Sequence, residues 1–258
     1  MLATLVALPA FAQNLTATVG ASAGVSAAGT TVSAKMQARI TTGKGRADQE
    51  IDRRVSMLND LNVSVQAMAK VSADVKSSIS TQVSTEVSNL STLKAKIDAD
   101  TDIPTLQADI KSITADYRIF MLVIPQGRII VAADKIGTVA DSMTAFSEKL
   151  QTRISEAQSA GNDVTSLSAS LSDMNAKIAD ANTQASAAVS HVSSLTPDNG
   201  DKTIMASNNA AIKQSRADLK IAMQDLAAAR KDSASIVSGL KSFEASATTT
   251  TNTSAGTQ

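Results

Sequence analysis

The feature that most constrains this chain is the spacing of apolar residues in its second half. Between Val164 and Leu195 they recur in alternating steps of three and four residues without a miss, and residues 212–243 repeat the pattern. This heptad spacing is typical of a helix that buries one stripe of its surface against another helix. The sequence therefore predicts two long helices that pack along their length.

We call these stripes the first and the second seam. The first seam comprises Val164, Leu167, Leu171, Met174, Ile178, Ala181, Ala185, Ala188, Val192 and Leu195. The second seam comprises Ile212, Ser215, Leu219, Ala222, Leu226, Ala229, Ser233, Ile236, Leu240 and Phe243. The short connection at residues 195–201 predicts that the two helices are antiparallel neighbours. Because Ala and Ser recur in the seams, we expect the helix axes to approach closely and to bury less apolar area per turn.

The first half carries similar stripes that are less regular. One comprises Ile51, Val55, Leu58, Leu61, Val65 and Met68, and the next comprises Val75, Ile79, Val83, Val87, Leu90, Leu93 and Ile97. Between them lies a joint near residues 71–74, with Ser72 as a candidate N-cap. Pro104 disfavours a helical residue before it, so we expect a helix to end there and a new one to start at Thr105.

The stripe of that new helix is interrupted at Pro125. It comprises Leu106, Ile110, Ile113, Tyr117, Phe120 and Ile124 before the proline, and Ile129, Ala132, Ile136, Val139, Met143, Phe146 and Leu150 after it. The two parts are out of phase by about two residues, which at roughly 100° per residue moves the apolar face to the other side. Residues 119–133 are therefore apolar nearly all round, with Arg128 as the only charge. We predict a kinked helix that is buried on both sides, and the alternative is an apolar hairpin around residues 125–128 that enters a membrane.

Composition favours helices throughout. Aromatic residues make up 2% of the chain, and 11 Gly and 4 Pro leave few turns, whereas sheet proteins draw on aromatic residues and frequent turns. We predict an all-α fold, an elongated antiparallel helical bundle or coiled coil of about four to six long helices over residues 47–243. The Ala/Gly/Ser/Thr-rich segment 13–46 is predicted to be flexible and residues 244–258 disordered, since few large side chains offset the entropy of ordering them.

The amino terminus indicates export. Residues 1–12 form an apolar run that ends in Ala10-Phe11-Ala12, a small-x-small pattern typical of a secretory cleavage site. The run is shorter than the span of about 20 residues that crosses a membrane. We therefore expect a signal peptide at residues 1–12 and an extracellular, cell-surface or periplasmic location. No Lys or Arg precedes Lys35, which leaves open a start upstream of Met1.

Charge and residue types exclude several functions. Lys+Arg and Asp+Glu balance at 24 each, so the chain lacks the positive excess by which proteins bind nucleic acid. The absence of Cys and the single His exclude thiol nucleophiles, disulfides and nearly all transition-metal sites. We predict that the protein is not an enzyme and has no catalytic, cofactor-binding or metal-binding residues.

One pattern imitates a metal site. Asp98, Asp100, Asp102 and Asp109 match ligand positions of a calcium-binding helix-loop-helix, but Ile103 stands where the sharp turn requires Gly. The twelfth position also lacks the bidentate Glu. We interpret the segment as a solvated linker whose acidic groups favour the start of the next helix.

Three smaller features have ordinary structural explanations. The oxygen-rich segment 198–201 is explained by turn chemistry. His191 lies beside the first seam near a helix C-terminus, where we expect a surface role. Residues 43–45, Gly-Lys-Gly, lack the spacing of a phosphate-binding loop and are interpreted as a break before the first long helix.

Three stretches of the chain resemble a group of uncharacterised exported helical proteins of bacteria. They are NLSTLKAKIDADTD at residues 89–102, SITADYRIFMLVIPQGRIIVAADKI at 112–136 and LTPDNGDKTIM at 195–205. The similarity spans about residues 48–243. The resemblance implies export and an all-helical fold, and it implies no activity and no site residues.

These observations lead to one expected function and one alternative. We expect a non-enzymatic exported helical protein with a structural or interaction role in the cell envelope or at the surface. Its partner is an unknown protein or a second copy that associates through the seams, and nucleic acid is not expected. The alternative is a membrane-active or lipid-binding protein that uses the apolar segment 119–133, so membrane contact is the less favoured expectation.

Overall fold

A computed structural model describes residues 27–115, 121–198 and 200–254 of the chain. Within these ranges the backbone forms six helices and no strand. They are α1 (Ala27–Gln66), α2 (Ala73–Ala99), α3 (Ile103–Ala115), α4 (Val123–Ser159), α5 (Thr165–Ser193) and α6 (Lys202–Ser254). The predicted all-α fold is confirmed.

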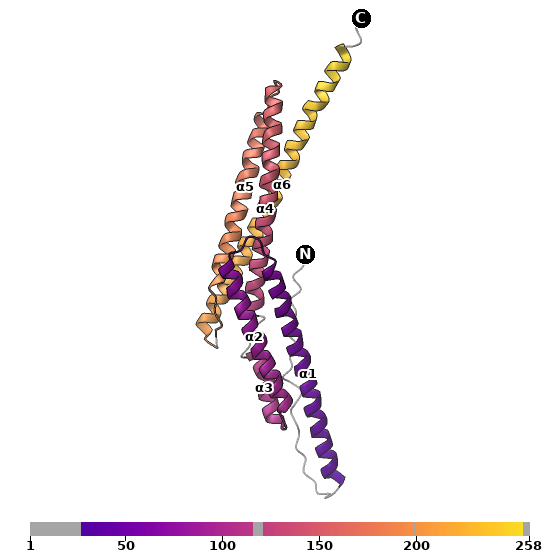
Figure 1. The fold of residues 1–258 in the computed structure, drawn as a ribbon, viewed down its shortest axis with the longest axis vertical. Coiled ribbons are helices and arrows are strands. Elements are labelled where there is room, and N and C mark those ends of the chain that lie inside the picture. The colour runs from indigo at the N-terminus through magenta and orange to yellow at the C-terminus, as the bar shows by residue number, and fades with distance from the viewer. Residues whose placement is uncertain (1–26, 116–120, 199, 255–258) are drawn as a thin grey trace.

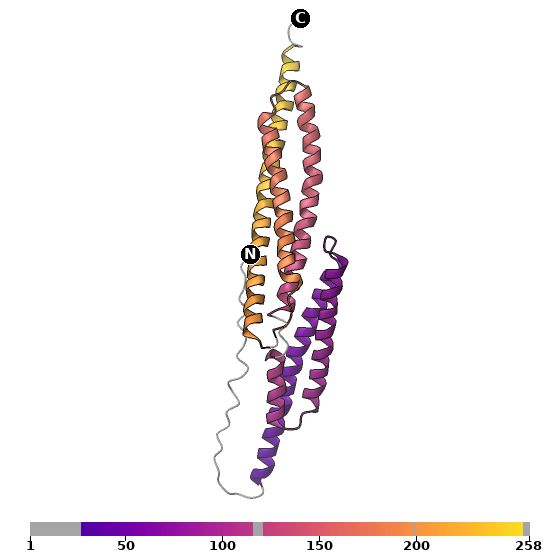
Figure 2. The same ribbon diagram turned by 90° about the vertical axis from the view of Figure 1, so that its left-hand side faces the viewer.

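The helices form two three-helix bundles that share one long axis and overlap in the middle of the molecule (Figure 1). Helices α1 to α3 pack against one another in the lower half of this view, and α4 to α6 in the upper half. The same arrangement is visible after a rotation of 90° (Figure 2), where α6 extends beyond the upper ends of α4 and α5. The described chain is therefore a rod made of two staggered bundles.

Both seams are buried as their spacing predicts. Every position of the first and second seam is buried, except Leu195 and Phe243, which are half-buried. The antiparallel helices α5 and α6 form the most extensive helix pair of the molecule. Gly239 of α6 allows the closest approach, because a Cβ there would lie 2.5 Å from Leu167 Cδ2. The seams thus close within one chain.

The stripe predicted after Pro125 is wrong at two positions of α4. Val139 and Phe146 are 48% and 40% exposed, whereas their neighbours Ala140 and Ser147 are buried. The small residues lie in the interface because α5 packs closely there, and the Ser147 hydroxyl donates a hydrogen bond to Asn175 Oδ1 of α5. The larger side chains lie beside the interface, on the α4 surface.

The predicted flexible and disordered flanks are also corrected for the described residues. The helix α1 begins at Ala27, so residues 43–45 lie inside it and not in a break. Gly43 packs against α3, where a Cβ would lie 3.1 Å from Leu106 Cδ2, and Lys44 Nζ donates to the Asp98 carbonyl at 2.6 Å. At the other end α6 continues to Ser254. Residues 1–26, including the predicted signal peptide, lie outside the described residues.

Capping groups mark the starts of α2 and α3, and α3 begins at Ile103, two residues before the predicted Thr105. The Ser72 hydroxyl accepts a hydrogen bond from the Val75 N–H at 3.4 Å, so Ser72 is the predicted N-cap of α2. Asp102 caps α3 in the same way by accepting from the Thr105 N–H at 2.9 Å. Gly161 and Gly200 have positive φ angles of 88° and 89° in the two turns that connect α4 to α5 and α5 to α6.

Candidate functional site: the junction between the two bundles

The apolar segment around Pro125 joins the two bundles. Helix α3 ends at Ala115 and α4 starts anew at Val123, so the predicted single kinked helix is replaced by two helices. Pro125 is the third residue of α4, where its missing N–H leaves no helical hydrogen bond unmade. Residues 125–128 are helical, which contradicts the alternative hairpin. Tyr117 and Phe120 lie outside the described residues.

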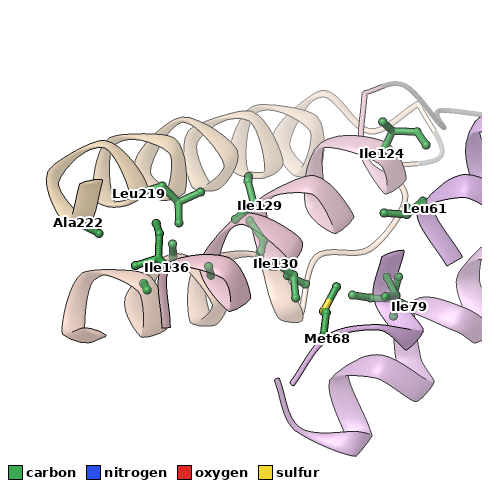
Figure 3. Packing of buried hydrophobic residues seen from close by; sticks show 14 of the residues in the cluster. Leu61, Met68, Ile79, Ile124, Ile129, Ile130, Ile136, Leu219 and Ala222 are labelled. Carbon is green, nitrogen blue, oxygen red and sulfur yellow. The ribbon is translucent and has the colours of Figure 1, made fainter. Parts of the chain in front are cut away.

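Burial on both sides is confirmed for the described part of this segment. Figure 3 shows Ile124 near Leu61 of α1, and Ile130 on the side of Met68. One helical turn and a half further on, Ile136 lies beside Leu219 of α6. All six side chains are at most 7% exposed and belong to one continuous apolar cluster. The first turns of α4 therefore merge the cores of the two bundles, and we call this region the junction.

A glycine permits the close contact between α1 and α4 at the junction. A Cβ added to Gly127 would lie 2.5 Å from Leu61 Cδ1 and 3.0 Å from Leu61 Cγ. Because Leu61 is 6% exposed, its side chain has little space into which it could withdraw. Any larger residue at position 127 would push the two bundles apart.

One buried amide anchors the junction to α5. Gln126 is 1% exposed, and its Nε2 donates a hydrogen bond to the Val192 carbonyl at 2.7 Å. Val192 lies in the last turn of α5, and its carbonyl also accepts a hydrogen bond from the Leu195 N–H at 3.3 Å. The Gln126 Oε1 atom has no hydrogen-bond partner among the described residues. This polar anchor was missed by the sequence reasoning, although Gln126 is a rare polar residue in an apolar segment.

The loop between α1 and α2 docks on the other side of α4. The Lys70 N–H donates to Asp134 Oδ1, and Lys70 Nζ forms an ion pair with Asp141. Asp134 is 8% exposed. Gly137 leaves room for the Lys70 stem, since a Cβ there would lie 3.2 Å from Lys70 Cγ. Lys70 thus holds the loop on α4 through its backbone N–H, the aliphatic part of its side chain and its charged amino group.

Two shallow hollows flank the junction. The larger, of about 350 Å³, is lined by Met57, Asp60, Leu61, Ser64, Ile124, Arg128, Val131, Ala132 and Lys135. The smaller, of about 270 Å³, is lined by Lys70, Val71, Ala133, Asp134, Gly137, Asp141, Asn182, Ala185, Ser186 and Val189. The larger hollow has an apolar floor, with Asp60 on the α1 side and two cations on the α4 side. It offers a contact surface between α1 and α4.

A buried charged side chain lies in the lower bundle, formed by α1 to α3. Arg54 is 2% exposed and its Nε donates to Glu50 Oε1 at 2.8 Å. Burial would raise the pKa of Glu50, but the hydrogen bond from Arg53 and the positive charge of Arg54 lower it overall. Burial lowers the pKa of Arg54, and the charge of Glu50 opposes this shift. Glu50 thus pairs with the buried charge of Arg54 inside a helix interface, and this role is structural.

The calcium-like pattern does not assemble. Asp102 caps α3, and Asp109 forms an ion pair with Lys96 at 2.7 Å. Asp98 is exposed, whereas Asp100 is 8% exposed at the end of α2. Burial, followed by the charges of Asp109 and Asp102, raises the pKa of Asp100. The described residues contain no group of three or more His, Cys, Asp or Glu side chains that could hold a metal ion.

Acidic groups line the contact between α5 and α6. His191 is exposed and its Nε2 lies 3.4 Å from Oδ2 of the buried Asp218, which also accepts from Gln214 Nε2 at 2.8 Å. Burial, and then the neighbouring Asp173 carboxylate, raises the pKa of Asp232. The turn at residues 198–201 is closed by Asp198, whose Oδ1 accepts from the Gly200 N–H at 2.9 Å. These groups shape helix contacts and turns.

Comparisons of this chain with protein-family models, with curated proteins and with solved structures found no match. In the part of the chain that the structure describes, no helix is long and apolar enough to cross a membrane. The resemblance to exported helical proteins of bacteria therefore stays a prediction. The junction is the best-defined site of the molecule.

Proposed function

We propose that this protein is a non-enzymatic, exported helical protein that acts as a rigid spacer and interaction module of the cell envelope or surface. The observation that supports it most is the junction, because Ile124, Gly127 and Gln126 join two bundles into one rod. If the two bundles were joined by a flexible linker, the distance between their far ends would not be fixed. The apolar run at residues 1–12 supports the export part of the proposal.

The spacer role is tested by measuring the distance between the bundles. The chain has no Cys, so spin labels can be attached at introduced Cys residues only. The exposed residues Ser91 of α2 and Ser172 of α5 suit such labels. For the double variant Ser91→Cys and Ser172→Cys we expect one narrow distance distribution. A pair within the upper bundle, Ser172→Cys and Ser235→Cys, is the control. A broad distribution for the first pair alone would refute a rigid spacer.

Export is tested separately in a bacterial host that produces the full chain with a C-terminal tag. We expect a tagged product outside the cytoplasm whose mass corresponds to a start at Gln13. Ala12→Lys should block this cleavage, whereas Ala17→Lys beyond the cleavage site should not. An uncleaved product that stays in the cytoplasm would refute export and leave the spacer role standing.

The alternative function uses residues 119–133 to enter a membrane. Ile124, Ile129 and Ile130 of that segment are at most 4% exposed and pack at the junction. Their release would separate the two bundles at a large loss of buried apolar area. The junction therefore favours the spacer proposal over this alternative.

A further inference from the structure

Cations predominate on the surface formed by α4 and α6, where the exposed acid Glu244 pairs with Arg153. At roughly 100° per residue, the seven Lys and Arg residues of α6 fall within an arc of about 100° that starts beside α4. They are Lys202, Lys213, Arg216, Lys220, Arg230, Lys231 and Lys241, and all are exposed. The acids of α6 that contact α5, Asp218 and Asp232, lie on the opposite side of the helix.

Helix α4 shows the same segregation. By helical phase its exposed cations Arg128, Lys135, Lys149 and Arg153 lie on one side of the helix, where Arg128 and Lys135 border the larger hollow and Arg153 forms an ion pair with Glu244 of α6. Of its acids, Asp134 and Asp141 lie on the other side, against Lys70, whereas Glu156 lies 3.6 Å from Arg153. Both helices run upward in Figure 1 and pack against each other, so their cations form two neighbouring rows. We call this surface the basic face.

Exposed apolar side chains lie among these cations. Val139 and Phe146 of α4 are 48% and 40% exposed, and Met223 of α6 is 57% exposed. By helical phase, the two α4 residues point to the α6 side and Met223 points to the α4 side. Ile136 lies near Leu219 in Figure 3, and Val139 and Met223 follow these two residues by three and four positions along helices that both run upward. The basic face is therefore amphipathic, and it combines cations with large apolar side chains.

We propose that the basic face binds an anionic lipid surface. The cations from Arg216 to Lys241 extend over roughly 37 Å at 1.5 Å per residue, and those of α4 from Arg128 to Arg153 extend equally far. Peripheral proteins bind anionic membranes by such a combination of Lys and Arg with a few inserted apolar side chains. Arg128 and Lys135 also line the larger hollow of the junction, whereas the remaining cations of the basic face lie outside both hollows. The straight double row fits a flat partner better than a single acidic helix. This inference goes beyond the proposed function, and apart from Arg128 it uses residues outside the segment 119–133.

The charges can be tested with two matched triple variants of the full chain. Lys220→Gln, Arg230→Gln and Lys241→Gln remove three cations from the basic face. The control variants Lys35→Gln, Arg46→Gln and Lys111→Gln remove the same residue types from exposed positions of the other bundle. Co-sedimentation is measured with vesicles of phosphatidylcholine and phosphatidylglycerol in equal parts. We expect the first triple to weaken binding by on the order of 100-fold and the control triple to change it little.

The apolar contact can be followed by fluorescence, because the chain contains no Trp. Phe146→Trp places a single indole on the basic face, and Val63→Trp places one on α1, where the side chain is 71% exposed. We expect a blue shift on addition of the anionic vesicles for Trp at position 146 and none at position 63. Circular dichroism confirms that each variant keeps its helix content.

Three results would overturn the inference. Failure of the wild-type chain to sediment with anionic vesicles at low salt would do so directly. Equal binding to vesicles of phosphatidylcholine alone would remove the role of charge. Binding to polyglutamate without binding to vesicles would assign the face to an acidic protein. Each result is independent of export and of the spacer distance.

Discussion

The two bundles of this rod differ in the side chains that line their cores. The upper bundle buries seven alanines, namely Ala133, Ala140, Ala181, Ala185, Ala188, Ala222 and Ala229. The lower bundle buries Ala47 alone among its described alanines and otherwise uses Ile, Leu, Val and Met. Small residues let long helices approach closely over many turns, whereas large ones hold helices further apart. The most regular heptads of the chain belong to the alanine-lined bundle.

The largest expected effect tests whether the seam positions carry the stability of the upper bundle. Leu171 is 3% exposed, so Leu171→Ala leaves a cavity and should cost about 2–5 kcal/mol of unfolding free energy. Ser168→Ala, on the exposed flank of the same helix, should stay within about 0.5 kcal/mol. Chemical denaturation measures both. Equal effects at the two positions would show that α5 does not pack on its seam.

The same measurement on the lower bundle sharpens the comparison. Leu58 is fully buried, and Leu58→Ala should also cost about 2–5 kcal/mol. Because the junction merges the two cores, we expect Leu58→Ala and Leu171→Ala each to lower the midpoint of a single transition. Two separate transitions in either variant would mean that the bundles unfold independently.

A smaller effect is expected at the junction itself. Gly127→Ala forces a methyl group against Leu61 and should cost about 1–3 kcal/mol. The matched control is Gly45→Ala in α1, where a Cβ meets nothing within 4 Å. There the change should stabilise the protein by about 0.5–1 kcal/mol, since Ala is the better helix former. A stabilising effect at both positions would contradict the tight contact.

The acidic contact between α5 and α6 predicts a pH-dependent effect. Burial and then Asp173 raise the pKa of Asp232, so its ionised form opposes folding and its protonated form does not. Asp232→Asn should therefore raise the melting temperature at about pH 7, and the gain should shrink as the pH falls to about 3. Asp180→Asn, an exposed control on α5, should change little at either pH. A gain that is independent of pH would exclude charge as the cause.

The smallest expected effect concerns metal ions. Since Asp102 caps α3 and Asp109 pairs with Lys96, the calcium-like pattern has no free ligand set, and neither calcium nor EDTA should move the melting temperature. A rise of several degrees with calcium, abolished by Asp100→Asn, would contradict this reading.

Much of the fold follows from apolar spacing alone, and the exceptions share one cause. Both seams were predicted in register because each position was read within a long uninterrupted repeat. The interpretation failed at Val139 and Phe146, where the larger residue was assigned to the core and the adjacent Ala140 and Ser147 were passed over. An interpretation based on apolar spacing assigns the largest apolar side chains to the core. Close contacts between helices instead favour small side chains at the interface. A strict heptad count through Ala133, Ala140 and Ser147 would have found the correct stripe.

The junction was predicted only in part. The phase change at Pro125 indicated burial on two sides, but the division into two bundles depends on Gly127 against Leu61 and on Gln126 against Val192. These contacts link positions about 66 residues apart in the chain. Local periodicity carries no information on such pairs. The helix over residues 27–46 was missed for a related reason, since Gly43 and Lys44 are ordered by α3 and the end of α2.

The repeat of the upper bundle has a consequence for how this protein can change in length during evolution. The anchors of the junction described above reach no further along α4 than Asp141, and above the junction α4, α5 and α6 pack against one another. Inserting or deleting seven residues at one level of all three helices preserves every seam position and alters the rod by about 10 Å. Related chains could thus differ in reach by whole heptads while keeping the same anchored base.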